Sequence, residues 1–156
     1  MTKIYYREIQ PEDIQALAKI RSKEWGSEAY WISRIQGYLN GSKSPKQAKP
    51  ERMIFVAAEE EKIIGFIAGH LTNRFECQGE LQWINVIESY QGKGIASKLL
   101  QIMAKWFVQH RANSVCVNVE PDNAKGLSFY TKHKAETLDD HWMKWENISV
   151  LDQMPD

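Results

Sequence analysis

The segment Gln91–Ser97, with the sequence Gln-Gly-Lys-Gly-Ile-Ala-Ser, stands where an apolar stretch ends and a helical pattern begins. Its upstream flank, residues 81–87, is β-branched and apolar and predicts a buried strand. Downstream, the side chains of one helical face recur every three or four positions, namely Ile95, Leu99, Ile102, Met103, Trp106, Phe107 and His110. Glycines let a backbone approach an anion closely, and the first turn of a helix adds unpaired N–H donors and the positive end of its dipole. The segment therefore predicts a turn that binds a pyrophosphate.

The remaining patterns predict a mixed order of strands and helices. Pro11 opens one helix, and Ser27 and Gly41 have the residue types of the N-cap and the C-terminal end of another. Strands are expected at 4–7, 53–58, 62–70, 80–87, 114–119, 136–138 and 142–146, helices at 11–21, 28–40, 95–110 and 121–132, and a long polar loop at 42–50.

Composition excludes several classes of protein. The 20 basic and 20 acidic side chains cancel, which argues against a dedicated nucleic-acid binder and favours a small-molecule partner. The chain shows neither a signal-peptide core nor an apolar run long enough to span a membrane, so a cytoplasmic protein with no membrane partner is expected. Cys77 and Cys116 lack the spacing of a zinc site or a disulfide framework, and no metal is expected.

Two motifs make the chain resemble the GNAT superfamily of acetyl-CoA-dependent N-acetyltransferases. The family's phosphate loop, Gln/Arg-x-x-Gly-x-Gly/Ala, is matched at every fixed position by residues 91–96, and its pattern Asn-x-x-Ala-x-x-Phe-Tyr-x-Lys is matched by residues 123–132 with Gly126 in place of alanine. After Lys132 the family usually has x-Gly-Phe, whereas this chain has His-Lys-Ala. The resemblance covers about residues 3–147. It implies an α+β fold with a mixed, mostly antiparallel sheet of about seven strands flanked by four helices. The length of 156 residues is that of one domain, so a single N-acetyltransferase domain over residues 1–156 is expected, with its core at about 3–147.

Other readings of the glycine turn fit less well. The spacing Gly92-x-Gly94-x-x-Ser97 is close to a dinucleotide fingerprint, with Glu120 as a distant acid for the ribose, but a Rossmann half would alternate strands and helices from the start. A Walker motif is excluded because no Gly-Lys-Ser/Thr is present. A turn that merely joins strand to helix would explain the glycines but leaves the second motif unexplained.

The resemblance implies how acetyl-CoA would be held. The strand 82–86 would separate from its neighbour and pair with the pantetheine arm, and a backbone donor at Val86 would polarise the thioester carbonyl. Asn123 would contact the cofactor, cap the next helix, or do both. The expected cofactor-binding residues are Ile84, Val86, Gln91, Gly92, Lys93, Gly94, Ala96, Ser97 and Asn123.

Tyr130 is the expected general acid, since a phenol can protonate a thiol leaving group; packing within its helix is the alternative. A general base is harder to assign. Strand alternation would point Glu80, Gln82, Ile84 and Val86 to one side, and family members that use a carboxylate carry it at the position of Gln82. Glu80 could act through a water, the amine could arrive neutral, or Glu80 could be an ordinary surface acid.

The expected reaction is direct transfer of acetyl to a primary amine in a ternary complex, with a small molecule as acceptor. A protein N-terminus or lysine is the alternative acceptor, and a sensor that binds acyl-CoA without turnover is a different class that stays open. Aromatic residues such as Trp25, Trp31 and Tyr38 could hold a cationic amine by their ring faces or could fill the core. A homodimer is expected only by analogy with the family.

Overall fold

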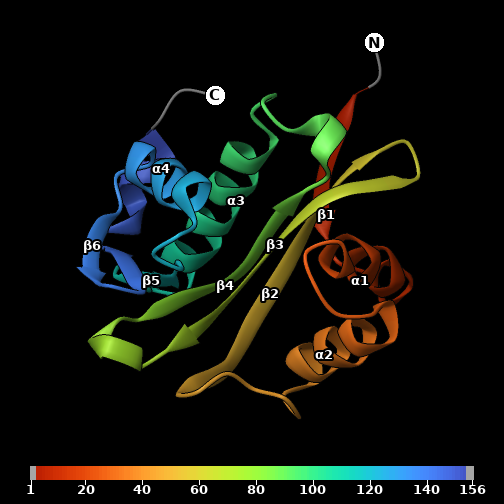
Figure 1. Ribbon diagram of the computed structural model, residues 1–156. Helices are drawn as coiled ribbons and strands as arrows, with labels where there is room; N and C mark the ends of the chain where they lie inside the picture. The colour runs from red at the N-terminus through yellow and green to blue at the C-terminus, as the bar shows by residue number, and fades with distance from the viewer. Residues whose placement is uncertain (1–2, 154–156) are drawn as a thin grey trace.

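The computed structural model of the protein describes residues 3–153 (Figure 1). One seven-stranded sheet has the order β1-β2-β3-β4-β5-β7-β6, and its neighbours are antiparallel except for β4 and β5, which are parallel. The strands are β1 Ile4–Glu8, β2 Ala48–Glu59, β3 Lys62–Thr72, β4 Gly79–Val86, β5 Val115–Asn118, β6 Glu136–Asp139 and β7 Trp142–Trp145. The helices are α1 Ile14–Ser22, α2 Glu28–Asn40, α3 Ile95–Gln109 and α4 Ala124–Lys132, with 3-10 turns at Pro11–Asp13, Arg74–Glu76, Glu88–Tyr90 and Ile148–Gln153. The α+β prediction is confirmed.

Local signals set the ends of α2, whereas long-range pairing sets the start of β2. Ser27 caps α2 by accepting a hydrogen bond from the Tyr30 N–H at 3.0 Å, and Gly41 ends it at a φ of +84°. The predicted polar loop over residues 42–50 is too long, because β2 already begins at Ala48, which pairs with Thr72 of β3. The start of β2 was missed because its residues have the polar composition of a loop.

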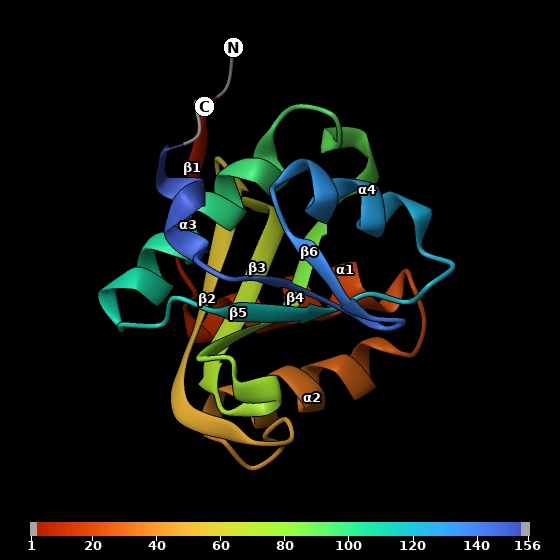
Figure 2. The ribbon, with the colours of Figure 1, turned by 90° about the vertical axis from the view of Figure 1, so that its left-hand side faces the viewer.

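Two apolar layers cover the sheet. On one face α1 and α2 pack on β2, β3 and β4, and on the other face α3 packs on the sheet beside the C-terminal strands (Figures 1 and 2). Leu100 and Ala104 extend the buried face of α3, while Ile102 is half-buried and His110 is exposed, so the predicted stripe is wrong at these two positions. None of the helices within residues 3–153 is long and apolar enough to cross a membrane.

The parallel pair β4–β5 is short. Only Gly79, Glu80 and Leu81 of β4 are in register with β5, opposite Val115, Cys116 and Val117. Past Leu81, β4 has β3 on one edge and no β5 partner on the other. The predicted separation of residues 82–86 from the neighbouring strand is therefore confirmed.

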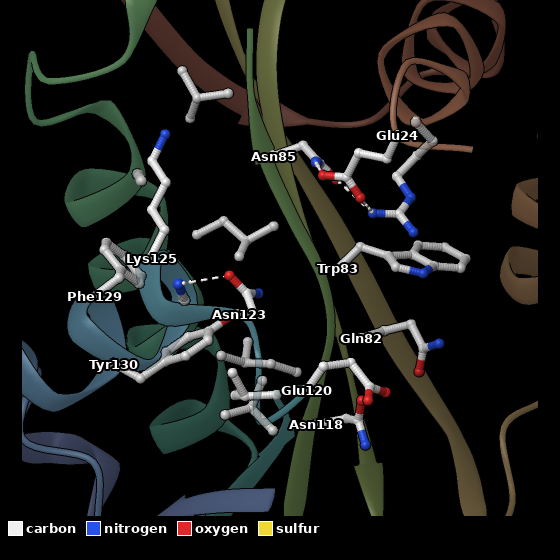
Figure 3. Close-up of a pocket in the computed structure, with 18 of the residues that line it drawn as sticks. Glu24, Gln82, Trp83, Asn85, Asn118, Glu120, Asn123, Lys125, Phe129 and Tyr130 are labelled. Atoms are coloured by element: carbon white, nitrogen blue, oxygen red, sulfur yellow. Dashed lines mark hydrogen bonds and ion pairs between the residues drawn. The ribbon is translucent and has the colours of Figure 1, made fainter. Parts of the chain in front are cut away.

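A β-bulge interrupts β4 at Gln82. Leu81 lies opposite Gly69 and Trp83 lies opposite Ala68, which leaves Gln82 as the extra residue. Gln82 and Trp83 consequently both point toward the α1–α2 face (Figure 3). The expectation that Glu80, Gln82, Ile84 and Val86 share one face is wrong, because Ile84 and Val86 pack against the α3 cluster on the other face, past the bulge.

Candidate active site

The glycine turn forms an open cradle at the start of α3. Gly92 and Gly94 have φ of +78° and +84°, a region that favours glycine, and a Cβ placed on either would meet no atom within 4 Å. Gly94 caps α3 without a side-chain hydrogen bond, so helix geometry leaves the N–H groups of Ile95, Ala96 and Ser97 without partners from the preceding turn. Free space, backbone donors and a helix dipole fit a pyrophosphate at this place.

Gln91 fixes the cradle to its surroundings. Its Nε2 donates to the carbonyl oxygen of Val86 at 2.9 Å, and its Oε1 accepts a hydrogen bond from Lys125 of α4. The side chain thus ties the end of β4 to α4 across the mouth of the gap. The ammonium of Lys93 lies 5.3 Å from the centre of the Tyr90 ring, beside the turn.

The edge of β4 that faces the gap offers backbone groups. The Ile87 N–H donates to the Ile64 carbonyl of β3 at 2.9 Å. Because N–H groups alternate along a strand, those of Ile84 and Val86 point to the opposite edge, toward the gap. The carbonyl of Val86 shares that edge and is already bonded by Gln91.

Asn123 stands at the start of α4, on the cradle side of β4 (Figure 3). Its Oδ1 accepts a hydrogen bond from the Gly126 N–H at 2.9 Å, so the expected helix-capping role is present. A Cβ on Gly126 would lie 2.6 Å from Asn123 Nδ2, which explains why glycine suits a position where alanine was expected. Capping uses Asn123 Oδ1, and the contact of Asn123 with the cofactor stays a prediction.

Tyr130 lies on the same side of the gap and is 7% exposed, with its ring packed edge-on against Phe129 and Trp145. Burial raises the pKa of the phenol well above its ordinary value of 10. The hydroxyl therefore stays protonated at neutral pH. Packing and a catalytic role are compatible here, because the residue also lines the cavity.

The sequence did not predict the pairing of half-buried Ser97 with buried His133. The Phe129 carbonyl lies 2.7 Å from His133 Nδ1, so that nitrogen carries the proton, and in the neutral ring Nε2 accepts from the Ser97 hydroxyl at 2.9 Å. His133 is 3% exposed and lines the cavity. The only sequence signal was its place in the His-Lys-Ala segment that departs from the family pattern.

Glu80 lies at the other side of the gap and is 4% exposed. Its Oε1 accepts a hydrogen bond from Arg74 Nε at 2.8 Å and lies 3.6 Å from His70 Nε2. The other nitrogen of His70 is 2.9 Å from the hydroxyl of Tyr38. Glu80 thus lines the cavity as part of a buried polar chain, and it is not an ordinary surface acid.

A second polar group on this side was also missed. Arg21 Nη1 donates to Glu24 and to Asn85 at 3.1 Å each, and Asn85 Nδ2 donates to Glu24 at 2.9 Å. The group lies beside Trp83 on the α1 side of β4 (Figure 3). No local pattern could reveal it, because Arg21 and Asn85 are 64 residues apart.

One cavity of about 1470 Å³ connects both sides of the gap. Pockets for one small molecule usually span ~300–1000 Å³, so this one has room for two ligands. Within residues 3–153 no group of three or more His, Cys, Asp or Glu side chains could hold a metal. Fold and site together fit a protein that binds a pyrophosphate-bearing cofactor at α3 and has room for a second ligand on the α1–α2 side.

Comparison with known proteins identifies the class. The model of the acetyltransferase (GNAT) family matches residues 10–134, and the chain belongs to this family. The uncharacterized N-acetyltransferase YuaI of Bacillus subtilis (strain 168) is 29% identical over 140 residues, covering 85% of this chain and 80% of that protein. The protein is an acyl-CoA-dependent N-acetyltransferase, and acetyl-CoA is its acetyl donor.

Solved structures share the fold. The PaiA N-acetyltransferase from Thermoplasma acidophilum, crystallised with coenzyme A, superposes with a TM-score of 0.66 at 22% identity, covering 91% of this chain and 98% of that chain. An acetyltransferase from Thermus thermophilus superposes with a TM-score of 0.73 at 15% identity, covering 93% and 99%. At these identities the likeness concerns the architecture.

Proposed function

We propose that the protein transfers acetyl from acetyl-CoA directly to a primary amine of a small molecule while both are bound. The observation that carries this proposal is the separation of β4 from β5 after Leu81, because the resulting gap joins the phosphate cradle to the α1–α2 side of the cavity. The proposed cofactor-binding residues are Ile84, Val86, Gln91, Gly92, Lys93, Gly94, Ala96, Ser97 and Asn123.

In this proposal the main chain does most of the binding. The N–H groups at the start of α3 would hold the pyrophosphate, and the free edge of β4 would pair with the amide-containing arm. The N–H of Val86 would donate to the thioester oxygen and stabilise the negative charge that develops there. Gln91 holds the peptide unit that follows Val86 through its bond to the Val86 carbonyl, and so fixes the end of β4 next to the proposed donor.

Tyr130 is the proposed general acid. Acetyl-CoA supplies an activated acetyl group and a thiol leaving group. The phenol of Tyr130, kept protonated by burial, would donate its proton to the sulfur as the C–S bond breaks.

Glu80 is the proposed acceptor of the amine proton, acting through a water that bridges the carboxylate and the amine. Its bond to Arg74 keeps the carboxylate oriented toward the cavity side of β4. An amine that arrives neutral would bypass this step, and then replacement of Glu80 would leave turnover unchanged.

Titration with acetyl-CoA, followed by an amine screen that detects released thiol, tests the proposal. Tyr130→Phe should lower kcat at least tenfold at nearly unchanged acetyl-CoA affinity, because acid-base groups usually contribute ~10²–10⁴-fold to the rate. The matched control is Tyr5→Phe, because Tyr5 is exposed on β1 and does not line the cavity. Unchanged kcat in Tyr130→Phe would refute the assignment, and binding without any turnover would favour the sensor class.

A further inference from the structure

The α1–α2 wall of the cavity is cationic. Four basic residues from α1, α2 and the segments that follow these helices line the cavity: Arg21, Lys23, Arg34 and Lys46. Two carboxylates lie on this side as well, but Glu24 is bonded to Arg21 and Asn85, and Glu80 is bonded to Arg74. Each of these two carboxylates is thus paired with an arginine, whereas Glu88 and Glu120 line the cavity outside the α1–α2 wall.

Two of the guanidinium groups share one indole ring. Arg21 lies 5.9 Å and Arg34 lies 5.6 Å from the centre of the Trp83 ring, and Arg21 also lies 4.4 Å from that of Trp31. Burial lowers the pKa of Arg21 below its ordinary value; the charge of Glu24 opposes this shift, and the charge of Arg34 adds to it. The two like charges therefore act on each other across Trp83.

Arg21 and Arg34 differ in their hydrogen-bond and ion-pair partners. Arg21 bonds Glu24 and Asn85 through Nη1, although its buried Nε has no partner in the part of the chain that the structure describes. Arg34 forms no ion pair with a carboxylate anywhere within residues 3–153, and it lines the cavity half-buried. Lys23 and Lys46 are exposed, so Arg34 is the half-buried basic residue of this wall that no carboxylate of residues 3–153 pairs with.

The Trp31 and Trp83 rings already carry the chain's own guanidinium groups. A polyamine would add a third positive charge beside Arg21 and Arg34, whereas an anion would relieve their repulsion and gain charge-assisted hydrogen bonds. Guanidinium presents a planar fork that suits a carboxylate. We infer that the acceptor is a small amine that also carries a carboxylate, held by Arg34 beside Trp83. The inference rests on the proposed function, which supplies the amine and the transfer.

Binding and turnover should be measured separately. The probes are L-amino acids, their carboxamides and spermidine, titrated by calorimetry into protein saturated with coenzyme A and then assayed with acetyl-CoA. The preferred amino acid should bind and react at least tenfold better than its carboxamide and than spermidine. The amine next to a carboxamide is less basic, so more of it is unprotonated at neutral pH. Intrinsic reactivity therefore favours the carboxamide and works against the expected preference for the amino acid.

Arg34→Met removes the charge but keeps a long apolar stem. It should abolish the preference for the acid while kcat/KM for the carboxamide and the affinity for coenzyme A stay within twofold of the original. Lys19→Met is the matched control, because Lys19 is exposed on α1 and does not line the cavity.

The outcomes separate the two proposals. Failure to bind acetyl-CoA, or binding without turnover of any amine, would contradict the proposed function. Turnover in which carboxamides or spermidine equal or exceed the amino acids would overturn only the inference, as would a preference that survives in Arg34→Met.

Discussion

The cradle can be tested by adding one methyl group at Gly94. In Gly94→Ala the new Cβ would stand in open space, so any loss of stability comes from the φ of +84° alone. A left-handed conformation costs an L-residue ~1–2 kcal/mol, and the lower entropy of the unfolded chain returns ~0.4–1 kcal/mol. The expected net loss is about 1 kcal/mol, which lowers Tm by ~2–4 °C in a chain of this length.

The chain offers a matched control for this variant. Gly41 has the same φ of +84° and the same open space, but it ends α2 far from the turn. Gly41→Ala should therefore lose the same stability, measured by thermal unfolding, and keep its affinity for acetyl-CoA.

Affinity separates the two glycines. Because the methyl group of Gly94→Ala would fill space proposed for the pyrophosphate, calorimetry should show acetyl-CoA binding at least tenfold weaker, a loss of ~1.4 kcal/mol or more. Affinity equal to that of the original protein would refute the cradle. A similar loss in Gly41→Ala would show that strain, rather than a blocked site, is responsible.

Two further predictions concern the buried titratable groups. Glu80→Gln leaves the Arg74 guanidinium without its charged partner and should lower the free energy of unfolding by ~1–3 kcal/mol in urea, together with kcat; stability within error of the original would contradict the described ion pair. Because burial raises the pKa of Tyr130, the pH profile of kcat should show no alkaline fall from this residue below pH ~10. The stability that Tyr130 contributes should be present below pH ~10. It should be lost as the pH rises above that value, because the phenol ionises in the unfolded chain before it ionises in the folded protein. A fall of kcat near pH ~8 that disappears in Tyr130→Phe would contradict the second prediction.

Local chemistry made much of the fold predictable. The glycine turn, the cap at Ser27 and the end of α2 at Gly41 each depend on residues a few positions apart, and the structure has all three as expected. The separation of β4 from β5 came from the family resemblance, since nothing in the residues 82–86 themselves demands it.

Other features depend on partners distant in the chain. Ser97 bonds His133, 36 residues away, and Arg21 bonds Asn85, 64 residues away. Helix and strand periodicity relates only residues a few positions apart, so it could not predict these contacts. The bulge at Gln82 was missed for the same reason, because the extra residue exists only relative to the register of β3.

The bulge also bears on how a direct transfer could work. Without it, strict alternation would place Glu80 and Val86 on the same side of β4, together with the thioester that Val86 is proposed to hold. With it, Glu80 lies on the face of His70 and Tyr38, while Val86 packs with the cluster that contains Tyr130. The proposed base and acid therefore stand on opposite walls of one gap. An amine entering from the α1–α2 side would lose its proton on one wall, and the thiol would receive a proton from the other, so neither group would have to serve both steps.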